Sequence, residues 1–206
     1  MSVEMLASDI FREFNAKPES QHIANEFALT ELARLIASVR PQSILEIGAG
    51  IGTITKLVLT HPNRPTHLTS TEGHPVCLSE LSKNLKGIEL TGYTLVNSAT
   101  ELDLNRHYDL VIFDGTLDDE QQYAVFSSGT WCFVEGNRSK TMEALKQKLA
   151  ERGMTIAFEK KRPDDKKFRL FSSRRFLGLR LPALMMNPVK GCSLGQVFRA
   201  DAVVPA

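Results

Sequence analysis

The sequence predicts an α/β fold: a doubly wound, mostly parallel, seven-stranded sheet with helices on both faces and N-terminal helices over the cleft. Two observations lead to this prediction. From residue 42 onward, short apolar segments of strand length alternate with segments of helical periodicity. One of the short segments, 110–113, is apolar without interruption, which is typical of a central parallel strand covered on both faces.

About 40 residues of helical character precede the first strand. Residues 1–19 are amphipathic, and Pro18 interrupts any helix there. A second helix is expected over 20–39, because apolar residues from Ala28 to Val39 recur along one helical face. Ser20 is its expected N-cap, and Pro41 closes the segment.

The remaining elements follow in alternation. We expect strands at 43–47, 66–72, 93–97, 108–114, 130–135, 154–159 and 195–199, and helices at 53–60, 75–86, 118–126 and 139–152. A length of 206 residues suits one domain. Within residues 1–206 we expect N-terminal helices (1–40), a cofactor-binding core (42–160) and a basic tail with the last strand (161–206).

The stretch 43–55 runs from a strand into a glycine turn and then into a helix. Gly48, Gly50 and Gly52 stand at every second position of the turn. Glycine allows a sharp turn and leaves no Cβ where a ligand lies against the main chain. The stretch therefore predicts a ligand-cradling βα unit.

Acidic residues stand at the expected carboxyl ends of four strands: Glu46, Glu72, Asp114 and Glu135. Ligands of doubly wound sheets bind outside these ends. Glu72 follows the glycines at the distance where a carboxylate accepts the hydroxyls of a ribose. Together these features predict an adenosine-containing ligand.

The glycine register distinguishes between adenosine ligands. Dinucleotide turns favour G-x-G-x-x-G, whereas Thr53 occupies the position of the third glycine here. The negative charge of Glu46 at the turn would disfavour a pyrophosphate and favour a cationic ligand. S-adenosylmethionine is cationic and needs no phosphate site, so we expect it as the cofactor.

The stretch 45–53 resembles motif I of the class I S-adenosylmethionine-dependent methyltransferases, and 109–115 resembles their fourth-strand motif. The resemblance covers about residues 20–160. It implies that the glycine turn holds the methionine end of the cofactor, that Glu72 binds the ribose, and that the adenine edge meets the strand-three loop. The expected cofactor residues are Glu46, Gly48, Ala49, Gly50, Gly52, Glu72, Gly73, His74, Ser98, Ala99 and Asp114.

A narrower resemblance is to catechol-type O-methyltransferases. Those enzymes bind a divalent metal through an Asp at the end of strand four and an Asp-Asn pair after strand five. Asp114 matches the first position, and Glu135-Gly136-Asn137 approximates the pair. A metal is the less favoured alternative, because carboxylates at strand ends often accept hydrogen bonds from neighbouring backbone amides.

The expected reaction is transfer of a methyl group to an oxygen, nitrogen or carbon nucleophile. Positioning is the main task of such an enzyme, and Asp114 or Glu135 would orient or deprotonate the acceptor. Two rival interpretations remain. A nicotinamide-dependent oxidoreductase shares the strand–glycine–helix unit, and a non-catalytic member of the fold would bind S-adenosylmethionine without turning it over.

Composition restricts partners and location. The net charge is +1, no apolar run reaches the length of a membrane span, and the N-terminus lacks the pattern of a secretion signal, so we expect a cytoplasmic protein. A small-molecule acceptor is favoured. Ten basic residues against two acids over 160–190 keep nucleic acid as an alternative acceptor. No pattern indicates an oligomeric state.

Overall fold

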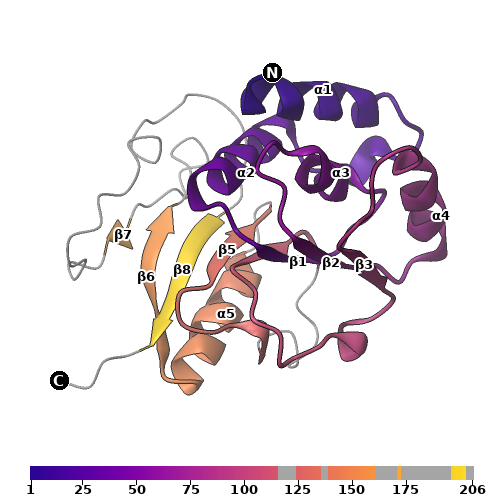
Figure 1. Ribbon diagram of the computed structural model, residues 1–206. Coiled ribbons are helices and arrows are strands. Elements are labelled where there is room, and N and C mark those ends of the chain that lie inside the picture. The colour runs from indigo at the N-terminus through magenta and orange to yellow at the C-terminus, as the bar shows by residue number, and fades with distance from the viewer. Residues whose placement is uncertain (116–123, 136–138, 161–170, 173–195, 203–206) are drawn as a thin grey trace.

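The computed structural model describes residues 1–115, 124–135, 139–160, 171–172 and 196–202. One sheet runs through it in the order β3-β2-β1-β4-β5-β8-β6-β7, with helices on both faces (Figure 1). The α/β doubly wound fold expected from the alternation of elements is confirmed.

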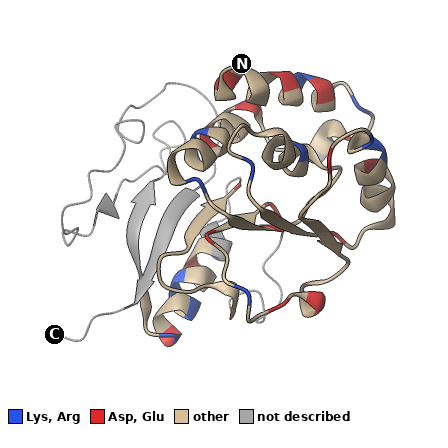
Figure 2. Cartoon of the chain, in the orientation of Figure 1, with Lys and Arg blue, Asp and Glu red and all other residues tan. Residues whose placement is uncertain are grey.

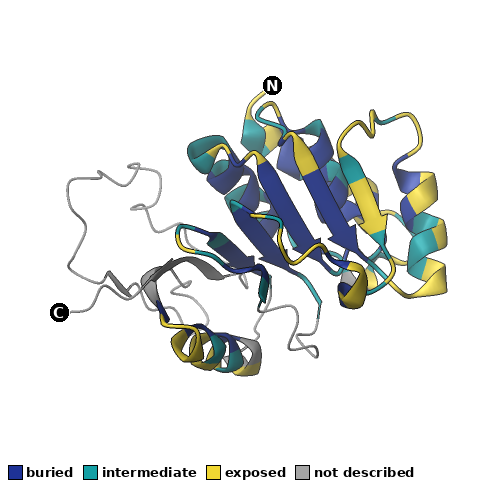
Figure 3. Cartoon of the chain, turned by 60° about the horizontal axis from the view of Figure 1, so that its bottom comes forward, coloured by how far each residue is buried: buried dark blue, intermediate teal, exposed yellow. Residues whose placement is uncertain are grey.

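The first five strands form the parallel part of the sheet. They are β1 (Ser43–Ile47), β2 (His67–Thr71), β3 (Tyr93–Val96), β4 (Leu110–Phe113) and β5 (Trp131–Val134), and each pairs in parallel with its neighbours in the order 3-2-1-4-5. Every residue of β1 and β4 is buried, whereas edge strand β3 is largely exposed (Figure 3). The strand order changes direction between β1 and β4, so a crevice opens at their carboxyl ends.

Four helices lie on one side of this sheet. They are α1 (Val3–Asn15), α2 (Glu26–Val39), α3 (Thr53–Thr60) and α4 (Pro75–Asn84). Helix α1 is packed on the outside of α2 and α3 (Figure 1). Their apolar side chains join one cluster, in which Phe14 of α1 and Ile36 of α2 are fully buried. Asp9 and Glu13 of α1 are exposed, and Figure 2 marks the acidic positions along this helix. The N-terminal helices are therefore part of the core of the domain.

The opposite face packs against α5 (Ser139–Glu151). Leu145 and Leu149 of this helix join a second cluster with Leu45 and Val111. Ile44, the neighbour of Leu45, belongs to the first cluster. This division follows from strand geometry, because successive side chains point to opposite faces of a sheet.

The helix expected over 20–39 is shorter than predicted. Residues Ser20–His22 form a 3-10 turn, η1, and the chain is then extended at Ile23. Helix α2 begins only at Glu26, because the Asn25 side chain accepts a hydrogen bond from the Ala28 amide (3.0 Å) and so caps the helix. The N-cap predicted at Ser20 is therefore wrong, and the segment 19–23 is a connection between two helices.

The sheet has eight strands among the described residues, one more than the seven predicted. Strand β8 (Gln196–Ala202) lies antiparallel between β5 and β6 (Met154–Lys160), and the additional strand β7 (Phe171–Ser172) is a two-residue pairing with β6. Most of the helix expected over 118–126 and most of the basic tail fall outside the described residues.

None of the helices in the described part of the chain combines the length and apolar character needed to cross a membrane.

Candidate functional site

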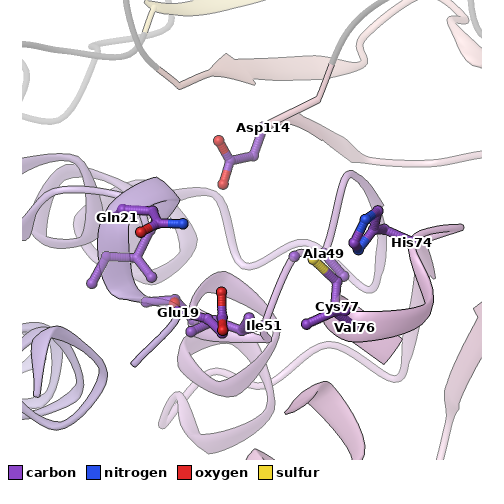
Figure 4. Close-up of a pocket in the computed structure, with 11 residues that line it drawn as sticks. Glu19, Gln21, Ala49, Ile51, His74, Val76, Cys77 and Asp114 are labelled. Atoms are coloured by element: carbon purple, nitrogen blue, oxygen red, sulfur yellow. The ribbon is translucent and has the colours of Figure 1, made fainter. Parts of the chain in front are cut away.

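Two adjoining cavities open at the carboxyl ends of β1, β2 and β4. The first compartment has a volume of about 350 Å³ and is lined by Ile47, Gly48, Gly50, Thr71, Glu72, Gly73, Asn97, Ser98, Ala99, Asp114 and Gly115. The second compartment has a volume of about 360 Å³ and is lined by Glu19, Gln21, Ile23, Ala49, Gly50, Ile51, Thr53, His74, Val76, Cys77 and Asp114 (Figure 4). Because Gly50 and Asp114 line both, the two compartments are contiguous across the glycine turn.

The three glycines of the turn have positive φ angles, of 89° at Gly48, 54° at Gly50 and 96° at Gly52. All three therefore have a backbone that favours glycine. A Cβ at Gly48 would lie 2.8 Å from the Gly115 nitrogen, and one at Gly52 would lie 2.6 Å from the Leu81 side chain. These two glycines allow the turn to pack against the end of β4 and against α4.

Gly50 has a different role. A Cβ built on it meets no atom within 4 Å, and the residue lines both compartments. Its missing side chain thus leaves open the space through which the compartments connect. Gly48 also lines the first compartment, but of the three glycines Gly50 is the one that lines both.

Glu72 follows β2 and fixes the glycine turn from the side. Its two carboxylate oxygens accept hydrogen bonds from the Gly50 amide and the His74 amide, both at 2.7 Å. The carboxylate is half-buried and lines the first compartment. Each oxygen has a second lone pair, so the carboxylate can accept further hydrogen bonds from a ligand.

Glu46 lies behind the turn and lines neither compartment. Its side chain is fully buried, and it accepts hydrogen bonds from Thr55 of α3 (2.7 Å) and from Ser70 of β2. Burial raises the pKa of Glu46 to about 7, and the charge of Glu72 acts in the same direction. The sequence predicted contact between Glu46 and the cofactor, whereas the structure places this carboxyl group in the core, where it links β1, β2 and α3.

The remaining predicted cofactor residues divide between the compartments. Gly73, Ser98 and Ala99 line the first, and Ala49 and His74 line the second. The Ser98 hydroxyl accepts a hydrogen bond from the Thr100 amide (3.2 Å) and begins the 3-10 turn η2 (Ala99–Glu101). This turn fixes the loop after β3 at the wall of the first compartment.

The two predicted catalytic carboxylates occupy different places. The Asp114 amide donates to the Ile47 carbonyl oxygen (2.9 Å), which holds the residue at the junction of the compartments. Glu135 lines neither compartment. Its Oε1 accepts a hydrogen bond from Asn25 Nδ2 (3.3 Å), so it connects the end of β5 to the start of α2.

Metal binding was expected to involve Asp114 with the turn after β5. Among the described residues, no group of three or more His, Cys, Asp or Glu side chains is placed to hold a metal ion. Asn137, the third expected ligand, falls outside the described residues. The metal alternative therefore stays a prediction.

Sequence reasoning missed the contribution of the segment between α1 and α2. Glu19, Gln21 and Ile23 line the second compartment, although they stand far from the glycine turn in the sequence. No spacing or motif marks them. The interruption at Pro18 indicated a loop, and only the packing of α1 and α2 against α3 brings that loop to the cleft.

The charges of the cleft are unbalanced. Among the described residues, three carboxylates (Glu19, Glu72 and Asp114) and one imidazole (His74) line the two compartments, and no lysine or arginine does. A cavity with this lining favours a cationic ligand over a phosphate or a pyrophosphate.

Comparisons with known proteins bear on the fold. No protein-family model matches the chain, and no curated protein matches its sequence. An O-methyltransferase from Bacillus cereus, solved with SAH, is similar in structure with a TM-score of 0.62 and 11% identity, over 96% of this chain and 90% of that one. A SAH-bound methyltransferase from Podospora anserina gives a TM-score of 0.57 and 12% identity, over 95% of this chain and 88% of that one.

A third similar structure is the precorrin-6y C5,15-methyltransferase from Geobacter metallireducens. Its TM-score is 0.54 and its identity 15%, over 88% of this chain and 90% of that one. At such identities the likeness concerns the fold. That fold is the Rossmann-like fold of the class I S-adenosylmethionine-dependent methyltransferases.

Proposed function

We propose that the protein is an S-adenosylmethionine-dependent methyltransferase. The observation that carries this proposal is the cleft itself. A carboxylate at the end of β2 adjoins a glycine turn, and the described residues that line the cavities on both sides of Gly50 include carboxylates but no lysine or arginine. This combination fits an adenosine ligand whose far end is positively charged.

The two compartments can divide the cofactor between them. The ribose would bind Glu72 in the first compartment, and the adenine edge would lie along Ser98 and Ala99. The charged methionine end would extend past Gly50 into the second compartment, toward Ala49 and His74. S-adenosylmethionine supplies a methyl group already activated by a positively charged sulfur.

Asp114 is the residue we assign to the reacting groups. It lies at the junction of the compartments and is half-buried. In this position its carboxylate can orient an acceptor and take the proton that the nucleophile loses. We assign Glu135 a supporting role, because its hydrogen bond to Asn25 holds the N-terminal helices against the end of β5.

We infer that the acceptor is a small molecule. The carboxylate-lined cavities disfavour a polyanion at the reacting centre. Nucleic acid remains the second candidate acceptor on account of the ten basic residues in 160–190. Methyl-transfer assays on phenols, amines and RNA separate these acceptors, and a protein that binds the cofactor but turns over none of them would be a non-catalytic binding protein.

Titration calorimetry with S-adenosylhomocysteine and with NAD tests the cofactor assignment. We expect S-adenosylhomocysteine to bind and NAD to bind weakly, because the pyrophosphate of NAD would meet Glu72 and Asp114 at a wall whose described residues include no lysine or arginine. Tight binding of NAD together with no response to S-adenosylhomocysteine would identify a nicotinamide-dependent protein and refute the proposal.

A further inference from the structure

The second compartment contains a carboxylate that no sequence motif marks. Glu19 comes from the connection between α1 and α2, immediately before η1, and lines this cavity. Within the described residues its carboxylate forms neither a hydrogen bond nor an ion pair. The other N-terminal acids Glu4, Glu13 and Glu26 each bind a partner side chain.

Cys77 lines the same cavity as Glu19 and lies within range of its charge. Burial raises the pKa of the Cys77 thiol, and the negative charges of Glu72 and Glu19 raise it further. Cys77 lines the second compartment with both Glu19 and Asp114. In Figure 4, Asp114 lies across this cavity from Glu19, so carboxylates border it on opposite sides.

These carboxylates would act differently on the two forms of the cofactor. S-adenosylmethionine has a sulfonium, an ammonium and a carboxylate, and therefore a net charge of about +1 at neutral pH. Its product, S-adenosylhomocysteine, has a neutral thioether and no net charge. The two molecules are otherwise alike in shape, so a negative charge in the cavity favours the substrate form electrostatically.

We propose that Glu19 is a specificity-determining residue, which makes the cleft prefer S-adenosylmethionine over S-adenosylhomocysteine. This inference rests on the proposed function. Glu19 is exposed in the free protein, so its effect is moderate. For a unit charge that acts over about 6 Å in water-like surroundings, Coulomb's law gives about a three-fold change in the affinity ratio.

The test is the affinity of both compounds for the full-length protein and for Glu19→Gln, measured by titration calorimetry without turnover. We expect Glu19→Gln to lower the preference for S-adenosylmethionine about three-fold, with the affinity for S-adenosylhomocysteine nearly unchanged. Glu19→Asp keeps the charge and should keep most of the preference.

The matched control is Asp9→Asn. This substitution also removes one negative charge from the N-terminal region, but Asp9 is paired with Arg12 on α1 and lines neither compartment. It should leave the preference unchanged. Salt gives a second readout, because about 1 M salt reduces the screening length to about 3 Å and should diminish the difference between wild type and Glu19→Gln.

The outcomes distinguish this inference from the proposed function. If wild-type protein binds neither compound, the proposed function fails. If it binds both and Glu19→Gln leaves their affinity ratio unchanged, the cofactor assignment stands and the role of Glu19 is refuted. If Asp9→Asn changes the affinity ratio as much as Glu19→Gln does, the role of Glu19 is also refuted, because the effect would then reflect the net charge of the protein alone.

Discussion

At the scale of single residues, two acidic side chains beside the glycine turn, Glu72 and Glu46, have environments that separate their roles. Glu72 is half-buried and its carboxylate accepts two backbone hydrogen bonds at the wall of a cavity. Glu46 is fully buried and accepts hydrogen bonds from the Thr55 and Ser70 side chains. Both stand at strand ends in the sequence, so the difference between them arises from the direction in which each side chain points.

Glu72→Ala tests the ribose assignment. We expect the affinity for S-adenosylhomocysteine to fall by about 2 kcal/mol, because charge-assisted hydrogen bonds to the ribose are lost. Titration calorimetry measures this change. Glu72→Gln is the control, since one oxygen remains to accept from the Gly50 amide, and it should lose less affinity than Glu72→Ala. Unchanged affinity in both variants would place the ribose elsewhere.

The raised pKa of Glu46 predicts how the stability of the protein depends on pH. Its pKa rises from 4.5 in the unfolded chain to about 7 in the fold. The native state therefore binds the proton more tightly, and stability falls as the pH rises from about 4.5 to about 7. Over this pH range the titration of Glu46 lowers the free energy of unfolding by about 3 kcal/mol.

Urea denaturation at several pH values measures the effect of Glu46. In Glu46→Gln the uncharged amide replaces the titrating group, so the loss of stability between these pH values should be smaller than in wild type. Two parallel stability curves would show that Glu46 titrates alike in the folded and unfolded states, which would contradict the expectation.

At the scale of elements, the glycine turn between β1 and α3 combines packing with ligand access. Gly48 and Gly52 are required because a Cβ would meet Gly115 or Leu81, whereas Gly50 faces open space in the cleft. The packing of the turn therefore requires Gly48 and Gly52, whereas Gly50 leaves space open in both compartments.

Substitutions at Gly48 and Gly50 should separate these roles. Gly48→Ala forces a strained backbone and a contact with the end of β4, and we expect a loss of stability of about 2 kcal/mol. Gly50→Asn should retain the fold, because asparagine tolerates positive φ, while its side chain blocks the passage between the compartments. Thermal unfolding and calorimetric titration of both variants measure the two effects, and a folded Gly50→Asn that binds normally would contradict them.

At the scale of the whole molecule, helix α1 belongs to the core that supports the cleft. Phe14 is completely buried, and the ammonium groups of Lys17 and Lys56 lie over its ring. Lys56 of α3 also binds Glu13 of α1 at 2.7 Å. Helix α1, which precedes the segment 19–23, is thereby fixed to α3, the helix that follows the glycine turn.

Phe14→Ala tests this connection. We expect a loss of about 3–5 kcal/mol of stability from the buried cavity, measured by denaturant unfolding. Because the segment 19–23 follows α1 directly, cofactor affinity should fall as well. Phe11→Ala is the matched control on a partly buried position of the same helix, and it should cost less stability. A Phe14→Ala protein as stable as wild type would mean that α1 is dispensable.

The alternation of strands and helices could be predicted from the sequence, because the apolar character of strands and the periodicity of helices are local signals. The boundaries of β1 and α3 coincide with the predicted ranges. The prediction from sequence failed where contacts between segments far apart in the chain determine the structure. The contact of Gly48 with Gly115 and the arrival of Glu19 at the cleft both depend on packing between segments that are far apart in the chain. The start of α2 was missed because the helical pattern extended past the true cap at Asn25.

The hydrogen bond from the Gly50 amide to Glu72 has a consequence for the kinetics of binding. It holds the turn in a defined shape before any ligand arrives. A ligand that meets a preformed loop loses less conformational entropy on binding than one that must order it. Association should then proceed in a single concentration-dependent step, without a slow rearrangement, and the lifetime of the complex rather than its rate of formation would set the affinity.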